Sequence, residues 1–401
     1  MEKAANRAGI TYFLSHPIQY FSPMLREMAK EFDLDVCYFS DNSLKESFDA
    51  GFGQKVAWDI PLLEGYQSQF LKNHRSTQGL NNRFWDVWNP GAWKAARQKG
   101  KKIIIVNGWT YGSNWLAMIS ARLSGREVWL RAENPLNQEL RKSARVRMVK
   151  RWLLGRFLFK FLVSRCLYIG TESKKFFQYY GVPERKLCFT PYAVDNHFFS
   201  TEYEKYRNCL PQLKEQLGLP AGKKIILFSG KYIEKKRPMD LLKAFAQLNN
   251  PDYCLVMVGE GQLRGEMEKY IADNQLQHVV LTGFVNQQSI PKYYAVADVF
   301  VICSGMGETW GLVTNEAMNF GKPVVVSSTC GCSADLVQPG VNGFVFEEGD
   351  INALAAHLKE ILENDAMRSK MGDASLEIIK NFSIPRIVEQ LKQAAANAAQ
   401  Q

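Results

Sequence analysis

Short apolar segments alternate with longer amphipathic segments along most of the chain. In the first half, the apolar segments begin with GITYFL at residues 9–14 and continue with LDVCYFS, KKIIIVNG, REVWLR and CLYIGT. The segments between them have helical periodicity, as in SPMLREMAKEF, where Ser22 is the expected N-cap and Pro23 the first helical residue. Strands that are apolar on both faces and alternate with helices predict a parallel sheet covered on both sides.

The second half repeats this pattern after a polar segment that ends near Gly222 and that we interpret as a linker. Five apolar strands follow: KKIILFSG, DYCLVMVGEG, HVVLTGF, DVFVICS and KPVVVSS. We therefore expect two doubly wound, Rossmann-like α/β domains, at residues 1–198 and 199–380, with the tail 381–401 packing back on the first domain. Ligands of such sheets bind outside the carboxyl ends of the strands, so we expect the active site in a cleft between the domains.

Composition narrows the class of protein. A chain of 401 residues that is 46% hydrophobic and 22% charged is typical of a globular protein with two or more domains. Its eight cysteines form no CxxC motif and its five histidines no pair with ligand spacing, which argues against a disulfide framework and a histidine-built metal site. The first residues do not have the order of a signal peptide, and no run of 18 uncharged apolar residues occurs. We expect a cytoplasmic protein without a spanning helix.

The net charge of +10 is concentrated in one segment. Residues 141–165 contain nine basic residues and no acidic one. Apolar residues recur there at helical spacing, which allows a helix that packs its apolar side on a sheet and exposes its arginines to water. The arginine side could in addition face anionic lipid, which would make the protein peripheral to the inner face of the cell membrane. Nucleic acid is not an expected partner, because no recognised binding module surrounds the patch.

Two glutamates, Glu308 and Glu316, stand eight positions apart with Gly311 between them. A glycine makes one continuous helix across the stretch unfavourable, so we expect Glu308 in a loop and Glu316 in a helix that begins near Gly311. The amides of Gly311, Leu312 and Val313 would then face a ligand between the carboxylates. An anion flanked by hydroxyl groups, as in a nucleotide-sugar, matches this arrangement, although two surface acids would give the same spacing.

A basic cluster follows the first strand of the second half. Ser229 and Gly230 end that strand, Lys231 comes next, and Lys236 and Arg237 precede a helix that starts at Pro238. Lysines at a strand end and a helix N-terminus favour a diphosphate site. Such charges stabilise a departing diphosphate without a metal, so we expect no metal and no other cofactor.

Two further motifs are weaker. Gly259 and Gly261 follow a strand as in a dinucleotide fingerprint, but the third glycine is one position late and no acidic residue ends the next strand, which argues against hydride transfer. Asp33 and Asp35 resemble a metal-binding carboxylate pair, but they precede a strand instead of following one, so we interpret them as a solvated turn.

The first half offers candidates at its strand ends. His16, in SHPIQYFSP, follows the first strand, and it binds a phosphate or hydroxyl group or packs within its loop. Arg131 and Glu133 follow another strand and could pair with each other.

Taken together, these motifs identify a family resemblance. SGKYIEKKRP, VGEGQLR, the segment from Thr282 to Ser304, the glutamate pair and NGFVFEEGD occur in the order seen in the retaining glycosyltransferases of family 4, which have the GT-B fold. The resemblance is strong from about Phe228 to Glu360 and looser before it. Lys231 stands where arginine is commoner, SHPIQY replaces a glycine-rich turn, and the histidine expected near LRAENP is missing.

The resemblance implies a transfer of a hexose from a UDP- or GDP-linked sugar to an acceptor hydroxyl with retained configuration, in the synthesis of cell-surface polysaccharide or lipid-linked glycan. It implies that Glu308 contacts the hexose, Glu316 the ribose, and Phe284 and Val285 the base. We assign catalysis to Glu308, Lys231, Lys236 and His16. The predicted donor site contains in addition Ser229, Gly230, Gly259, Glu260, Phe284, Val285, Gly311, Leu312, Val313 and Glu316. The predicted acceptor side contains Gln19, Asn107, Arg131 and Glu133. Epimerase, phosphorylase, hydrolase or silent nucleotide-sugar binder are the alternatives.

Overall fold

The computed structural model describes residues 7–44, 47–49, 51–56, 58–75 and 83–399. The opening residues 1–6, parts of the long connection before Arg83 and the last two residues of the tail lie outside this range. Contacts between Cα atoms divide the chain into two compact units. The first unit contains Met1–Ser47, Pro61–Pro191 and Ile384–Gln401, and the second contains Phe48–Ile60 and Tyr192–Ser383. The division along the chain thus differs from a single boundary after residue 198, because Phe48–Ile60 groups with the second unit.

The first unit is built on a seven-stranded sheet in which every pairing is parallel. Its strand order is β5-β2-β1-β6-β7-β8-β9. The strands are β1 (Gly9–Leu14), β2 (Asp33–Tyr38), β5 (Gln67–Phe70), β6 (Ile103–Asn107), β7 (Glu127–Ala132), β8 (Arg165–Tyr168) and β9 (Leu187–Phe189). All six residues of β1 are buried, which agrees with a strand covered by helices on both faces.

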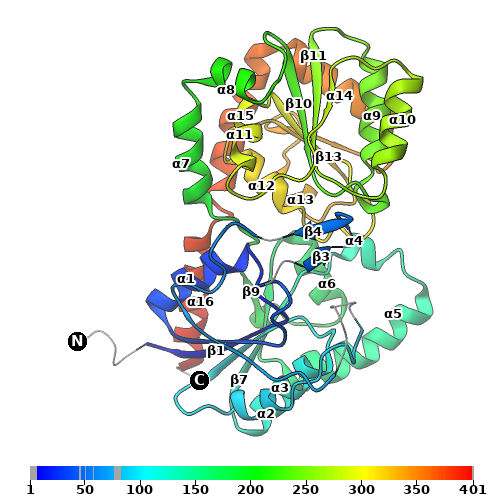
Figure 1. Cartoon of the computed structure of the whole chain (residues 1–401). Coiled ribbons are helices and arrows are strands. Elements are labelled where there is room, and N and C mark those ends of the chain that lie inside the picture. The colour runs from blue at the N-terminus through cyan, green and yellow to red at the C-terminus, as the bar shows by residue number, and fades with distance from the viewer. Residues whose placement is uncertain (1–6, 45–46, 50, 57, 76–82, 400–401) are drawn as a thin grey trace. The chain divides into compact units, whose positions relative to one another are not determined.

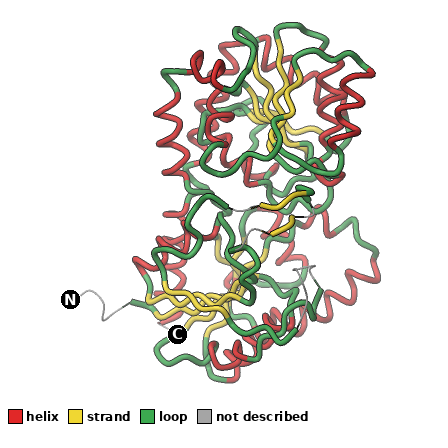
Figure 2. The backbone as a smooth tube through the Cα atoms, in the orientation of Figure 1, coloured by secondary structure: helices red, strands yellow, loops and turns green. Residues whose placement is uncertain are grey.

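Helices lie on both sides of this sheet (Figure 2). They are α1 (Phe21–Glu31), α2 (Gly91–Ala95), α3 (Gly112–Leu123), α4 (Leu136–Glu139), α5 (Ala144–Lys150), the π-helix η2 (Arg151–Leu162), α6 (Thr171–Tyr179), the short η3 (Glu184–Lys186) and the C-terminal α16 (Ile384–Ala399). The terminal helix α16 packs against α1 and β9. It is therefore part of the first unit although it follows the whole second unit in the sequence.

The second unit has a six-stranded sheet, also parallel in every pairing, with the order β12-β11-β10-β13-β14-β15 (Figure 1). Its strands are β10 (Lys224–Ser229), β11 (Tyr253–Val258), β12 (Val279–Leu281), β13 (Val299–Ile302), β14 (Val324–Ser327) and β15 (Gly343–Phe346). The five predicted strands are all present, and β15 is an addition that the apolar pattern did not single out. A separate two-stranded sheet pairs β3 (Ser47–Asp49) with β4 (Gln54–Val56).

The helices of the second unit alternate with its strands. They are α7 (Asn196–Tyr206), α8 (Leu210–Gln216), η4 (Glu234–Lys236), α9 (Pro238–Leu248), α10 (Arg264–Asp273), α11 (Ile290–Val296), α12 (Leu312–Met318), α13 (Ser333–Leu336), α14 (Ile351–Glu363) and α15 (Asp365–Ile379). The core beneath α9 and α14 includes Leu242, Leu255, Val301 and Leu358, all fully buried. These are the apolar positions that produced the strand and helix patterns in the sequence.

Both sheets reverse their strand order at one place. The reversal lies between β1 and β6 in the first sheet and between β10 and β13 in the second. At such a switch point the loops leaving the two neighbouring strands run in opposite directions, which leaves a crevice at the carboxyl ends. We therefore expect ligand-binding residues in the loops after β1 and β6 in one unit and after β10 and β13 in the other.

Three local predictions were wrong. Ser22 is not the N-cap of α1, since the helix begins at Phe21 and the buried Ser22 hydroxyl donates to the Leu62 carbonyl oxygen at 2.8 Å. The segment interpreted as a linker contains the helices α7 and α8, whose buried Phe199, Tyr206 and Leu213 supply packing that the polar composition concealed. Asp33 and Asp35 are not a solvated turn.

Asp33 and Asp35 lie in β2, where both carboxylates pair with the ammonium group of Lys101 at 2.8 and 3.1 Å. Lys101 is buried, so the two acids compensate its charge. The pair therefore has a structural partner in the connection that precedes β6.

Gly343 gives a direct test of the β14–β15 packing. A Cβ atom at this position would lie 1.8 Å from the Val324 carbonyl oxygen, whereas one at Gly265 in α10 would meet nothing within 4 Å. We expect Gly343→Ala to lower the free energy of unfolding by about 1–3 kcal/mol through overpacking. Gly265→Ala should leave it unchanged or raise it slightly, since alanine favours a helix. Denaturant titration of both variants checks this, and equal stability of the two would contradict the packing.

Candidate functional site

The loop after β10 contains the first group of predicted site residues. Ser229 ends the strand, and the Gly230 amide donates to the Val258 carbonyl oxygen of the neighbouring strand at 2.9 Å. Gly259 lies against this loop so closely that a Cβ atom there would be 1.9 Å from the Gly230 carbonyl oxygen. The predicted residues Ser229, Gly230 and Gly259 are thus brought together by adjacent parallel strands, and the absence of a side chain at Gly259 permits the approach.

Lys236 and Glu308 form an ion pair across the switch point. Lys236 lies in η4 after β10, and Glu308 lies in the loop after β13. The Lys236 ammonium group donates to Glu308 Oε2, and the ammonium of Lys235 lies 4.0 Å from the same oxygen. The structure therefore joins the two elements that the sequence suggested separately, the basic cluster and the first glutamate.

The electrostatics of Glu308 depend on these lysines. Only 8% of the residue is exposed, and burial by itself raises the pKa of its carboxyl group. The charges of Lys236 and Lys235 oppose this effect, and the net pKa of Glu308 lies below its ordinary value. Burial lowers the pKa of Lys235. A carboxylate and a cation are thus held together where both side chains are largely buried.

Gly311 ends this loop and begins α12. Its φ of 102° lies in the left-handed region, and a Cβ atom would come within 3.0 Å of Ile302 Cδ1. Leu312 and Val313 are the first residues of α12, as the sequence indicated. Glu316 lies inside α12, is 2% exposed and accepts a hydrogen bond from the Tyr294 hydroxyl at 2.7 Å. The two glutamates therefore have different surroundings, since Glu308 has a cationic partner and Glu316 a phenolic one.

The loops after β11 and β12 contain the residues predicted to lie near the base. Gly259 and Gly283 form an isolated β-bridge between the two loops. Glu260 is held by Arg264 at 2.6 Å, so its carboxylate has a partner within its own loop and helix. Phe284 and Val285 follow the bridge and are partly exposed. A half-buried aromatic ring at this place is available for packing against a planar ligand.

Sequence reasoning missed two aromatic residues at the same place. The Phe52 ring lies 4.8 Å from the Phe284 ring in an edge-to-face arrangement, and the Trp58 ring lies 6.3 Å from it. The ammonium group of Lys231 lies 4.6 Å from the centre of the Phe52 ring. Phe52 and Trp58 precede Phe284 by more than 220 positions in the sequence, so neither the local pattern nor the family motifs indicated them.

The predicted residues of the first unit lie at its own switch point. His16 follows β1, and its Nδ1 shares a hydrogen bond with the Ser15 hydroxyl at 2.9 Å. Burial lowers the pKa of His16, which favours the neutral ring. Gln19 is buried shortly after it, and Asn107 ends β6, where its carbonyl oxygen accepts from the Asn114 side chain at 3.3 Å. These polar groups gather at the carboxyl end of the first sheet.

Arg131 and Glu133 pair with each other, which was one of the two possibilities open at the start. Their closest atoms are 3.4 Å apart, and Arg131 also lies 4.8 Å from the centre of the Phe21 ring. Tyr12 of β1 was not among the predicted residues, yet it belongs to this group. Burial raises the pKa of Tyr12 to about 12, with Arg131 acting in the opposite direction. A charged pair, a phenol and an amide thus line the end of the first sheet.

Neither a metal cluster nor a membrane span is found in the described part of the chain. No group of three or more His, Cys, Asp and Glu side chains within it is arranged to hold a metal ion. None of the described helices combines the length and the apolar character needed to cross a bilayer.

Comparison with known proteins finds a family likeness over most of the second unit. Residues 211–377 match the family described as glycosyl transferases, group 1. Spore coat protein SA of Bacillus subtilis is 30% identical over 191 residues, which are 45% of this chain and 50% of that protein. Phosphatidyl-myo-inositol mannosyltransferase of Mycobacterium leprae is 30% identical over 187 residues, 45% of this chain and 48% of that protein. The chain thus spans about half the length of the curated relatives it matches.

The solved structures extend the likeness to the whole fold. HepE of Anabaena, crystallised in complex with UDP, superimposes with a TM-score of 0.74 at 20% identity, over 97% of this chain and 100% of that one. This likeness, together with the two parallel sheets, confirms the two-domain GT-B fold expected from the sequence. The matched residues 211–377, which include the paired Lys236 and Glu308 at the switch point, are thus similar to the glycosyl transferases of group 1.

Proposed function

We propose that this protein is a retaining glycosyltransferase that moves a hexose from a nucleoside diphosphate sugar to an acceptor hydroxyl. The observation that carries the proposal is the pairing of Lys236 with the buried Glu308 at the switch point of the second sheet. A diphosphate requires fixed positive charge, and a hexose requires hydrogen-bond acceptors for its hydroxyl groups. The structure provides both within one pair of loops.

The proposed reaction breaks the bond between the anomeric carbon and the β-phosphate oxygen. The electron pair of that bond remains with the diphosphate, whose new charge is stabilised by Lys231 and Lys236. The acceptor oxygen bonds to the anomeric carbon on the same face, and its proton passes to the leaving phosphate oxygen. Glu308 would hold the hexose hydroxyl groups, and its lowered pKa keeps it an acceptor at neutral pH. The step requires no metal, because lysines supply the positive charge.

The acceptor is proposed to bind at the first unit. His16, Gln19, Asn107, Arg131 and Glu133 gather at the carboxyl ends of β1, β6 and β7, where ligands of parallel sheets bind. The neutral ring expected for His16 has one nitrogen that accepts and one that donates, so it is suited to bond an acceptor hydroxyl group. Polar groups at these strand ends fit a carbohydrate hydroxyl better than an apolar molecule.

We further propose that the protein binds an anionic membrane surface through α5 and η2. Helical spacing assigned seven apolar residues to the packed side: Met148, Val149, Trp152, Leu153, Phe157, Phe161 and Leu162. All but Leu162 are exposed to water, between 38% for Leu153 and 68% for Met148. The residues that do pack are Leu154, Leu158, Phe159 and Leu162. Side chains that share a face are spaced differently in a π-helix than in an α-helix, so α-helical spacing did not predict which residues of η2 are buried. Met148 and Val149 lie in α5, none of whose residues is buried.

The exposed apolar side chains stand among cations. Trp152 is 67% and Phe161 57% exposed, and Arg145, Arg151, Arg156 and Lys160 are exposed in the same segment. Tryptophan beside arginine is suited to the boundary between lipid headgroups and acyl chains. The charge attracts anionic lipid at ~1 kcal/mol for each Lys or Arg near the surface. The named relative that acts on phosphatidyl-myo-inositol supports a lipid-linked acceptor for this chain.

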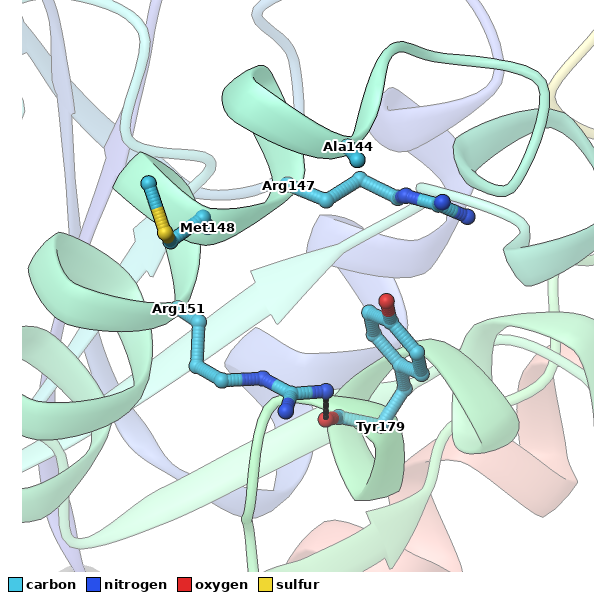
Figure 3. A pocket seen from close by; sticks show the side chains of 5 residues that line it. All are labelled: Ala144, Arg147, Met148, Arg151 and Tyr179. Carbon is cyan, nitrogen blue, oxygen red and sulfur yellow. Dashed lines mark hydrogen bonds between the residues drawn. The ribbon is translucent and has the colours of Figure 1, made fainter.

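A pocket beside this surface offers a site for a headgroup phosphate. Arg147 and Arg151 line it together with Ala144, Met148 and Tyr179, around a volume of about 190 Å³ (Figure 3). The Arg151 guanidinium lies 4.9 Å from the centre of the Tyr179 ring and donates to the Tyr179 carbonyl oxygen at 3.5 Å. The positive charge of two arginines that line one pocket is suited to a phosphate.

Incubation with labelled UDP- and GDP-sugars is the test of the reaction. Transfer to an added carbohydrate or lipid-linked acceptor, with retained configuration and in the presence of excess EDTA, is the expected result. Release of an epimer, a sugar phosphate or only free sugar would instead indicate an epimerase, a phosphorylase or a hydrolase. Loss of activity with EDTA that manganese or magnesium restores would contradict the metal-independent mechanism.

Replacement of the diphosphate lysines should affect catalysis more than stability. We expect Lys231→Ala and Lys236→Ala each to lower turnover by about 10²–10³, the usual cost of one such donor. Burial raises the pKa of Glu308, and Lys236→Ala removes one of the cations that lower it, so this pKa rises in the variant. The acid limb of the pH–rate profile therefore moves to higher pH. Kinetics between pH 5 and pH 8 measure both effects. Lys30→Ala, which removes an exposed pair with Glu27, is the control and should match the wild type.

Liposome flotation tests the membrane surface. We expect binding to vesicles that contain anionic lipid at low salt, and its loss at high salt or with Arg145, Arg151, Arg156 and Lys160 changed to glutamine. Lys150 is left intact, because it pairs with the buried Glu139. Lys205 and Arg207 are exposed cations elsewhere, and their glutamine variant should still bind. A folded wild-type protein that does not float at low salt would refute the proposal and favour a soluble acceptor.

A further inference from the structure

The segment Phe48–Ile60 lies in the first half of the sequence but packs within the second unit. It contains the paired strands β3 and β4 and interrupts the chain between β2 and β5 of the first sheet. Its described residues contact three loops of the second unit, which follow β10, β11 and β12. These are the loops that contain Lys231, Gly259 and Phe284.

The backbone of the segment approaches one of these loops closely. A Cβ atom at Gly261 would lie 2.9 Å from the Gly51 carbonyl oxygen and 2.5 Å from that of Tyr232. Gly261 has a φ of 156°, so the position disfavours a side chain for reasons of space and backbone conformation. Gly261 is the second glycine of the motif that resembled a dinucleotide fingerprint. In this structure the lack of a side chain at Gly261 leaves space for the β3–β4 segment.

Hydrogen bonds hold the other end of the segment. The Gln288 backbone amide donates to Asp59 Oδ2 at 3.2 Å, and the Gln288 side chain donates to the Asp59 carbonyl oxygen at 2.6 Å. Asp59 Oδ1 is buried and, within the described residues, has no hydrogen-bond partner. An acceptor in this state is suited to a ligand N–H or O–H group that arrives at the Phe284 loop.

Phe52 connects the two sides of the donor site. Its ring contacts Phe284, which the family resemblance places beside the base, and the ammonium of Lys231, which it places at the diphosphate. Trp58 contacts Phe284 from the same segment. All three rings are partly exposed, so they are accessible to a planar ligand. A nucleoside diphosphate likewise has a planar base at one end and an anionic diphosphate at the other.

We propose, on the basis of the donor-binding function proposed above, that Phe52, Trp58 and Asp59 form a wall of the nucleotide subsite contributed by the first half of the chain. Phe52 and Trp58 pack beside the nucleobase at Phe284, and Asp59 accepts a hydrogen bond from it. Lys231, whose ammonium group lies 4.6 Å from the centre of the Phe52 ring, turns from the ring to the diphosphate of a bound nucleotide. The wall recognises the base end of the donor, while the lysines recognise its phosphates.

Calorimetric titration of the full chain tests the proposal. The ligands are UDP, GDP, ADP and inorganic pyrophosphate, and the nucleotide that the wild type binds best serves as the reference. We expect Phe52→Ala and Trp58→Ala to weaken the reference nucleotide at least about fivefold, because base–aromatic stacking contributes that much or more. Pyrophosphate affinity should stay the same or increase in Phe52→Ala, since Lys231 is released from the ring. Phe52→Tyr retains the ring and should bind within about twofold of the wild type.

Controls separate the possible outcomes. Phe70→Ala removes an exposed aromatic residue that stacks on Tyr38 in the first unit, and it should leave nucleotide binding unchanged. Circular dichroism identifies any variant that does not fold, in which case Phe52→Leu replaces Phe52→Ala. Unchanged nucleotide affinity in the folded Phe52 and Trp58 variants would overturn the wall, and so would an equal loss of nucleotide and pyrophosphate. If the wild type binds none of the three nucleotides, the proposed donor function itself fails.

Discussion

The reversal of strand order in each parallel sheet is the constraint on which the rest of the structure depends. Between β10 and β13 the chain leaves neighbouring strands in opposite directions, so the loops that follow cannot cover each other. Lys236 and Glu308 lie on those two loops, and their ion pair spans the opening. The first sheet repeats this arrangement between β1 and β6, where His16 and Asn107 occupy the equivalent strand ends.

Burial makes Glu308 dependent on the charge of Lys236. A carboxylate with 8% exposure is unfavourable without a cation, and the lysines of η4 supply that cation. The same cations are those a diphosphate needs. In the proposed donor complex, Lys236 would exchange its Glu308 partner for the diphosphate. Glu316 does not share this role, since its partner is the neutral Tyr294 hydroxyl.

The surroundings of Phe52 and of η2 depend on packing that the local sequence does not indicate. Phe52 reaches Phe284 and Lys231 from a segment inserted between β2 and β5. Along η2, the π-helical spacing buries Leu154, Leu158, Phe159 and Leu162 and exposes Trp152 and Phe161 among arginines. In both places a set of apolar side chains is exposed beside positive charge, which is a surface suited to an anionic, partly apolar ligand.

The sequence by itself determined the two parallel α/β sheets, because strands buried on both faces need apolar residues at nearly every position. It also determined the loop, glycine and helix order from Glu308 to Glu316, because a left-handed backbone favours glycine and a helix begins directly after it. Tertiary structure alone decided that α7 and α8 replace a linker, that Lys101 binds Asp33 and Asp35, and that Glu308 pairs with Lys236. It also decided which face of η2 is buried and that Phe52 belongs to the second unit. The physical reason is that periodicity and local propensity report on neighbours along the chain, whereas charge pairing and ring packing depend on residues that only the folded sheets bring together.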